Sequence, residues 1–457
     1  MFMVRGGPTS PLLVFHRRIP DLDRRRLITI FVIAFIDILG FSLILPLVPY
    51  YTERYGASDF VTGLLVASYA AAQLIGAPLL GRLSDRYGRR PILLVSIAGT
   101  ALGFVVFGLA EQVGGALAGA LGGAALLNTL IVTVLFAARI IDGLTGGNIS
   151  VAQAYITDIT TAENRARGLG IIGVAFGLGF IIGPAVGGLL STVGLYVPVF
   201  VAAGIAGVNW FMVLAFLPES LGEEERSAIA DSQTAGERRS FSLKALREAL
   251  VRPLVGTLLL VTFFFGLAFA IVQTVFSLYA LRKFGLPEQQ TAFILTYVGV
   301  ISVIVQGGLI GPLTKRFSEI TLILGAIIVM AAGLLAWGLA PSVPLLLVSL
   351  APIAFAGGVM NVTLRSTITK AVTRQEYGGT LGLQSGIESL TRVLAPMLGG
   401  LLIGAMGAWA PGAAGTLILV ALLPFAWSRL MREKPLLAGP GSPSVPPQAE
   451  VQPAGPH

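Results

Sequence analysis

The chain has 457 residues, of which 55% are hydrophobic and 12% are charged, and its mean hydropathy is +0.84. A water-soluble domain of this composition would expose large apolar patches, so we expect a lipid bilayer around the protein. Cysteine is absent, and the only histidines, His16 and His457, lie in the terminal tails, so we predict no enzyme, no metal site and no cofactor. The formal charge of +8 comes from basic residues spread over membrane-proximal loops, and we expect no nucleic-acid partner.

Twelve apolar runs alternate with short polar connections along the chain. Each run is close to the roughly 20 residues that an α-helix needs to cross a bilayer. The sequence therefore predicts an all-α, polytopic membrane protein with twelve transmembrane helices. The predicted spans are 27–49, 61–81, 91–110, 126–155, 168–190, 195–217, 254–281, 290–312, 320–340, 344–368, 379–403 and 410–430.

The distribution of positive charge predicts the orientation of these spans. Most of the 31 lysines and arginines fall in the tails and in alternate connections that share one side of the membrane. Only Arg54, Arg282 and Lys283 fall in connections on the other side. Because cytoplasmic loops carry the excess of Lys and Arg, both termini are predicted to be cytoplasmic.

The longest polar stretch divides the chain into two halves. We predict an N-terminal tail at 1–26, a six-helix half at 27–217, a cytoplasmic linker at 218–252, a second six-helix half at 253–431 and a disordered tail at 432–457. The linker ends in SLKALREAL at 242–250, with leucines at helical spacing. This segment is predicted to be an amphipathic helix on the membrane surface or, alternatively, a plain helical spacer.

The two halves share an internal repeat. GPAVGGLL at 183–190 matches APMLGGLL at 395–402, an offset of 212, and GRLSDRY at 81–87 matches GPLTKRF at 311–317, an offset of 230. The first half must therefore hold extra residues between these landmarks, and we expect a longer outer loop at 113–125. Two pseudo-symmetric halves around a central cavity are the layout of a secondary transporter.

One connection, GRLSDRYGRRP, gathers four arginines around an aspartate between two apolar runs. It resembles the signature of the loop between helices two and three in the major facilitator superfamily. The pattern positions are Gly81, Asp85, Gly88, Arg89 and Arg90.

The resemblance implies a conformational relay at this signature. Asp85 would face the positive N-terminus of the eleventh helix and connect through Arg89 to an acid at the inner end of the fourth, here Asp158. By the two offsets, the equivalents of Asp85 and Asp158 in the second half are Lys315 and Lys370, so we expect a relay that acts in only one half. The alternative is that these charges only set the topology.

The first span, with IDILGFSLILPLVP at 36–49, resembles the helix-one pattern of the same superfamily and carries Asp37 near its middle. A charged group there costs about 2.5–3.5 kcal/mol, so it should face a wet cavity or a partner. Asp37 is therefore predicted to couple protons or bind substrate; the alternative is a structural hydrogen-bonding role.

The fourth span contains ARIIDGLTGGN at 138–148, which resembles the basic helix-four motif of the superfamily. Arg139 and Asp142 are three residues apart and therefore neighbours on one helical face. We predict a proton site formed by Asp37, Arg139 and Asp142. The alternative is a local structural pair of Arg139 with Asp142.

The fifth span resembles the helix-five motif associated with antiporters. Its matching residues are Gly177, Gly183, Pro184, Gly187 and Gly188. Small residues let helices approach closely, and a proline weakens the helical hydrogen bonds, so this span is a plausible pivot.

Polar residues in the second half complete the predicted cavity. Glu388 and Arg392 lie four residues apart in the eleventh span, where we expect an internal ion pair that shapes the substrate site or simply stabilises the helix. Gln273 in the seventh span is a further candidate.

Across all twelve spans the chain is similar to drug/proton antiporters of the tetracycline-exporter type. The resemblance implies a monomer in a bacterial inner membrane that exports drug-like or other small organic solutes in exchange for protons. Two alternatives stay open: a proton-coupled importer of sugars or organic acids, and a non-transporting membrane sensor or scaffold.

Overall fold

The structure of the protein, a computed structural model, describes residues 24–121, 123–161, 164–222, 226, 243–373 and 376–437. This part of the chain is helical, without strands, and it contains twelve helical spans that are long and apolar enough to cross a membrane. The predicted all-α class with twelve transmembrane helices is confirmed. The predicted tail beyond residue 437 and most of the linker lie outside the described residues.

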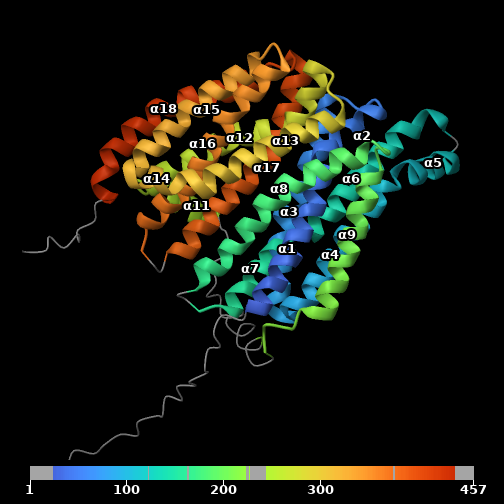
Figure 1. The fold of residues 1–457 in the computed structure, drawn as a ribbon, viewed down its shortest axis with the longest axis horizontal. Coiled ribbons are helices and arrows are strands. Elements are labelled where there is room, and N and C mark those ends of the chain that lie inside the picture. The colour runs from blue at the N-terminus through green and yellow to red at the C-terminus, as the bar shows by residue number, and fades with distance from the viewer. Residues whose placement is uncertain are drawn as a thin grey trace, which may run out of the picture.

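The first half contains α1 (Arg24–Ile44), η1 (Leu45–Leu47), α2 (Val48–Arg54), α3 (Asp59–Tyr87), α4 (Arg89–Gly108), α5 (Ala110–Ala120), η2 (Ala124–Leu126), α6 (Leu127–Thr145), α7 (Asn148–Ile159), α8 (Arg165–Ser191) and α9 (Val197–Phe216). The second half contains α11 (Leu243–Val251), α12 (Val255–Phe284), α13 (Glu288–Ile304), the π-helix η3 (Val305–Leu309), α14 (Ile310–Arg316), α15 (Glu319–Leu339), α16 (Val343–Lys370), α17 (Tyr377–Met406) and α18 (Ala410–Leu437). Figure 1 shows the first half in blue to green and the second in yellow to red, side by side.

Each half has its own hydrophobic core. One cluster of buried side chains extends from Leu254 to Leu430, and the two largest clusters of the first half lie between Leu27 and Leu217. We call the side that bears Arg24, Tyr87, Ile159 and Lys370 the terminal face, and the side that bears Arg54, Gly108, Phe284 and Met406 the opposite face.

Three predicted spans are not continuous α-helices. The first changes to a 3₁₀ turn at η1, where Pro46 lies, and the eighth contains the π-turn η3. The fourth, predicted as one helix over 126–155, is interrupted at Gly146 and Gly147 between α6 and α7. Such interruptions tend to mark functional sites, because they free backbone groups inside the membrane region.

The expected outer loop at 113–125 is wrong for most of its length. Residues Ala110–Ala120 form α5, which packs against α6 and projects at the right-hand edge of Figure 1. Gly114 makes this possible, because a side chain there would collide with Ile131 of α6. The additional residues of the first half therefore extend a helical hairpin.

Two helices continue past their predicted ends. α3 continues to Tyr87 instead of ending near 81, so all of GRLSDRY is helical and the connection to α4 is a single residue, Gly88. α18 continues to Leu437, past the predicted boundary at 431. α11 confirms the helix predicted at the end of the linker; its buried Ala249 packs with Val255 and Leu259 of α12.

Candidate functional site

Asp37 lies on α1 and is bound by an amide rather than by a cation. Asn148 Nδ2 donates to Asp37 Oδ1 over 2.5 Å. The hydroxyl of Ser96 on α4 lies within hydrogen-bonding distance of both Asn148 Oδ1 and the Thr145 carbonyl, and it can donate to one of them at a time. Hydrogen bonds therefore connect the aspartate to α4 and to the fourth span.

The break in the fourth span places Asn148 beside Asp37. Asn148 is the first residue of α7, directly after Gly147, and a side chain at Gly147 would collide with Leu80 of α3. The freed carbonyl of Gly146 accepts from Gln73 Nε2 at 2.8 Å. Because a membrane span offers no water to exposed backbone, this bond allows the helix to break at that point.

Arg139 and Asp142 form a buried pair on α6. Their side chains are 4% and 3% exposed, and Arg139 Nη2 lies 3.2 Å from Asp142 Oδ2. The guanidinium also lies over the rings of Tyr69, Phe104 and Phe107, 5.0–5.8 Å from their centroids. Arg139 Nε has no hydrogen-bond partner among the described residues. The pair is therefore neutralised in charge but not fully hydrogen-bonded.

The predicted three-membered cluster is divided in this structure. Within the described part of the chain, no ion pair joins Asp37 to Arg139: the arginine pairs with Asp142 and the aspartate with Asn148. The reason is local, because Asp142 is one turn away from Arg139 and the helix break brings a closer donor to Asp37. Sequence reasoning missed Asn148, although the Gly-Gly pair before it signals a helix interruption.

Polar residues of the second half lie on α12, α16 and α17. Gln273 is exposed even though its neighbours Val272 and Val275 on α12 are buried, so α12 borders open space at that point. Glu388 of α17 accepts from Gln384 Nε2 at 3.1 Å, and its other oxygen lies 3.5 Å from Arg365 Nη2 of α16.

The expected pair of Glu388 with Arg392 is wrong. Gln384 and Arg365 contact the two oxygens of Glu388, while Arg392 is exposed and makes no ion pair with any residue that the structure describes. The sequence could not indicate Arg365 as the partner, because it comes from a neighbouring helix.

Arg89 brings together two of the residues predicted for the relay. Its Nη1 lies 2.6 Å from Asp85 Oδ1, and its Nε lies 2.9 Å from Asp158 Oδ2 on α7. Ser84 Oγ accepts from the same guanidinium at 2.7 Å. Arg89 therefore ties the ends of α3 and α7 to the beginning of α4.

The expected meeting of Asp85 with the beginning of the eleventh helix stays a prediction. α3 and α17 pack through Gly63, Pro396 and Gly400. These residues lie near the beginning of α3 and the end of α17, at the opposite face and far from Asp85. Gly81 lies on α3 with nothing close to the position that a side chain would occupy.

Glu219 is a part of this site that sequence reasoning missed. Its carboxylate accepts from the backbone N–H groups of Arg89 and Arg90 at 2.8 and 3.1 Å, at the N-terminus of α4, where the helix dipole favours an anion. Gly88 leaves room for this carboxylate, because a Cβ added there would lie 3.0 Å from Glu219 Cδ. The φ of Gly88, +102°, also favours glycine at this position. The signal in the sequence was an acid two residues after the sixth span.

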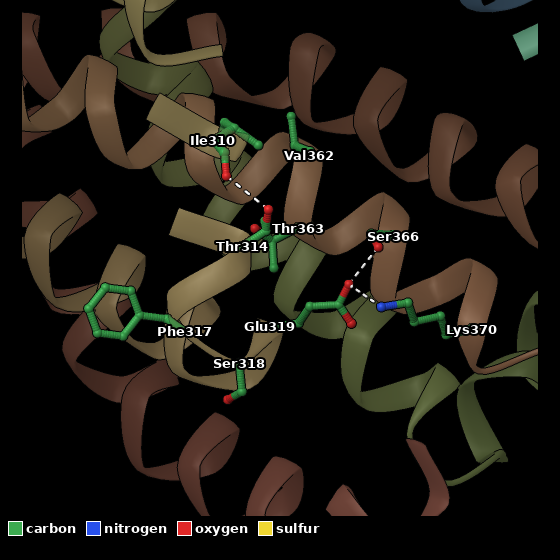
Figure 2. A pocket seen from close by; sticks show the side chains of 9 residues that line it. All are labelled: Ile310, Thr314, Phe317, Ser318, Glu319, Val362, Thr363, Ser366 and Lys370. Atoms are coloured by element: carbon green, nitrogen blue, oxygen red, sulfur yellow. Dashed lines mark hydrogen bonds and ion pairs between the residues drawn. The ribbon is translucent and has the colours of Figure 1, made fainter. Parts of the chain in front are cut away.

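The second half carries a matching pair with reversed charges, shown in Figure 2. Lys370 Nζ lies 2.8 Å from Glu319 Oε1, which also accepts from Ser366 Oγ at 2.5 Å. These residues line a pocket of about 540 Å³ between α14, α15 and α16. By the offset of 230, Glu319 corresponds to Arg89, so a cation paired with acids in the first half becomes an acid paired with a lysine in the second. Ion pairs are therefore present at the corresponding positions of both halves, and the expectation that the relay acts in only one half stays a prediction.

The motif glycines of α8 are contact points. Gly183 and Gly187 face α1, where side chains would collide with Ser42 and Leu43. Gly177 and Gly188 face α13, against Val303 and Ala292. Pro184 lies inside α8 between these positions. The span thus packs against both halves at once.

Arg282 joins the two halves at the opposite face. It binds both carboxylate oxygens of Glu53, at 2.9 and 2.6 Å, and donates to Asp59 Oδ1 at 2.7 Å. Tyr50 beside it donates to the Leu286 carbonyl at 2.8 Å. Among the described residues, Arg282 makes all the ion pairs between the halves. The sequence had indicated this arginine only as an exception to the charge distribution.

The major facilitator superfamily model matches residues 30–320 and 258–453. The chain is 30% identical over 416 residues to the class C tetracycline resistance protein of Escherichia coli, covering 86% of this chain and 95% of the relative. It is 30% identical over 384 residues to multidrug resistance protein 2 of Bacillus subtilis, covering 82% and 88%.

A solved structure agrees at the level of the fold. It is a bacterial homologue of the human lysosomal transporter Spinster in an inward-facing and occupied conformation, with a TM-score of 0.69 at 15% identity over 91% of this chain and 98% of that one. With a family model that matches most of the sequence and twelve spans arranged in this way, the chain is a multi-pass membrane protein that belongs to the major facilitator superfamily of membrane transporters.

Proposed function

We propose that the protein is a proton-coupled antiporter that exports drug-like or other small organic solutes by alternating access. The likeness to a tetracycline resistance protein and to a multidrug resistance protein supports the substrate class. The observation that carries the proposal is Asp37, an aspartate inside a membrane span whose hydrogen-bond partner is the neutral amide of Asn148.

A neutral partner suits an acid that must gain and lose a proton. Protonation of an aspartate in an ion pair would leave a buried cation without a counter-charge, which is costly. Here Arg139 already has Asp142 as its counter-ion, so Asp37 can be neutralised without isolating a charge. Protonation converts one oxygen of Asp37 into a hydroxyl, which alters its hydrogen bond with Asn148. Because Asn148 lies at the break in the fourth span and also contacts Ser96, protonation of Asp37 would alter the contacts at that break.

The orientation that we propose places the terminal face in the cytoplasm and the protein in the cell's inner membrane as a monomer. The excess of Lys and Arg on the terminal side supports this orientation. The contacts of Arg282 and Tyr50 then hold the outer side closed in this conformation. In the outward-facing form, a proton would reach Asp37 and weaken substrate binding, and the substrate would leave outward.

The proton gradient limits the substrate concentration gradient that such an exchange can maintain. One proton that moves down one pH unit and 100 mV supplies about 3.7 kcal/mol. That free energy supports a gradient of about 500-fold for a neutral solute exchanged one for one.

Transport into proteoliposomes tests the proposal. With an acidic lumen, the wild type should accumulate labelled tetracycline, and Asp37→Asn should lose this pH-driven uptake while it keeps the same melting temperature. Glu111→Gln is the matched control, because Glu111 is an exposed acid at the opposite face. Undiminished uptake by Asp37→Asn would contradict the coupling role. Uptake that instead follows protons inward would identify an importer, and binding without counterflow would identify a sensor.

A further inference from the structure

A basic hollow of about 670 Å³ lies at the terminal face, between the beginning of α1 and the end of α9. Three arginines line it: Arg25 and Arg26 from α1, and Arg90 from the first turn of α4. None of the described residues that line the hollow is acidic. Segments that are distant in the sequence therefore bring three positive charges to one place.

The other walls of the hollow are apolar and face outward. Ile28 on α1 and Phe216 at the end of α9 both line it, and each is 61% exposed. In a protein with twelve membrane spans, we expect exposed side chains of this kind to contact acyl chains. The hollow thus has a charged side and an apolar side, as a lipid molecule does.

Arg90 is held in place but not satisfied. Its Nη2 donates to the Leu214 carbonyl of α9 at 2.6 Å, and its backbone N–H is bound by Glu219 at 3.1 Å. Its Nε is buried and has no hydrogen-bond partner in the described part of the chain. Arg90 as a whole is half-buried and lines the hollow, so this anchored guanidinium adds a fixed positive charge to it.

We propose that this hollow binds the headgroup of an anionic membrane phospholipid, with its phosphate among Arg90, Arg25 and Arg26 and its acyl chains along Ile28 and Phe216. Guanidinium groups bind phosphate oxygens in paired hydrogen bonds, and basic pockets between spans at the cytoplasmic side suit anionic lipids. Because Arg90 follows Arg89 directly, the bound lipid restrains the end of α4 to which Asp85 and Asp158 are tied.

Native mass spectrometry of the detergent-purified protein tests this site. Titration with phosphatidylglycerol should show one tightly bound lipid in the wild type, and phosphatidylcholine should bind more weakly. Arg25→Gln/Arg26→Gln/Arg90→Gln should lower the affinity for phosphatidylglycerol about a hundredfold, since each basic group near an anionic lipid contributes about fivefold. The matched control is Arg316→Gln/Arg429→Gln/Arg432→Gln, which removes three exposed arginines from the other half.

The double variant Arg25→Gln/Arg26→Gln leaves the signature intact and should still lose at least tenfold, so the test does not depend on tolerance of a change at Arg90. Equal affinity of the wild type and both variants would overturn the proposal, as would an equal loss in the control triple variant. Competition by millimolar inorganic phosphate without any preference for phosphatidylglycerol would identify a plain anion site and would also overturn it.

Discussion

The partner of Asp37 is a neutral amide, and this choice determines what a proton can do there. Asn148 Nδ2 is 2.5 Å from Asp37 Oδ1, while Arg139 is paired with Asp142. The aspartate is therefore free to change its charge without breaking an ion pair. Asn148 is as important to this account as the acid itself, because it is the only hydrogen-bond donor to Asp37 among the described residues.

Replacement of Asn148 by leucine should reduce pH-driven transport about ten- to a hundredfold, because a hydrogen bond to a charged group contributes about 1.5–3 kcal/mol. The measurement is initial uptake into proteoliposomes at a fixed pH gradient. Asn209→Leu is the matched control: Asn209 is also buried and donates to α1, but to the Ile33 carbonyl, 3.1 Å away. That variant should lose stability rather than coupling. Equal losses of uptake in the two variants would argue against a special role of Asn148.

At the scale of the elements, interruptions and short connections position the charged groups. α6 and α7 are separated by Gly146 and Gly147, which turns Asn148 toward α1. α3 and α4 are separated by Gly88 alone, and the carboxylate of Glu219 binds the exposed N–H groups after it. That single-residue connection places Arg89 where it pairs with both Asp85 and Asp158.

Gly88→Ala should destabilise the protein by about 1–3 kcal/mol, because its backbone conformation, with φ +102° and ψ 155°, is accessible almost only to glycine. The added methyl group would also displace Glu219 from the N-terminus of α4. Scanning fluorimetry of the purified variant measures the shift in melting temperature. Gly81→Ala in the same signature is the control: Gly81 is helical and has open space around it, so stability should stay equal or rise slightly. A melting temperature of Gly88→Ala at the wild-type value would refute this explanation.

At the scale of the whole molecule, the halves are joined by ion pairs at the opposite face through Arg282. Alternating access requires these contacts to break when that side opens. The helix α8 has glycines against both α1 and α13 and lies where the halves would rock. Loss of Arg282 should therefore shift the population toward a form that is open at the opposite face.

Cysteine labelling can measure this shift, because the chain has no cysteine of its own. Ala67→Cys places a thiol at a buried position on α3, one turn beyond Gly63. With Arg282→Gln added, a membrane-impermeant maleimide should react several-fold faster. The control is Lys283→Gln, since Lys283 binds the Gly338 carbonyl within its own half at 2.6 Å. Unchanged labelling in the Arg282→Gln background would exclude the arginine as a determinant of closure.

The sequence was sufficient for the number of spans and the fold, because hydropathy and repeated motifs are local signals. It also indicated Arg89 and Asp158, because the family signature contains Arg89 and implies an acidic partner for it. It did not predict Asn148 as a partner or the contact of Glu219 with α4, because both depend on where separate helices meet. The ion pair of Glu388 with Arg365 was missed for the same reason: spacing along one helix says nothing about a neighbouring helix.

The most direct test of the account is a substrate-elicited proton signal. Proteoliposomes are loaded with a pH-sensitive dye, and tetracycline is added outside without an imposed pH gradient. We predict that the wild type releases protons from the lumen as substrate enters, so that the lumen becomes more alkaline, and that Asp37→Asn gives no signal while Glu111→Gln gives the full one. Substrate entry with an unchanged luminal pH in the wild type, or an equal signal in Asp37→Asn, would contradict the coupling of Asp37 to transport.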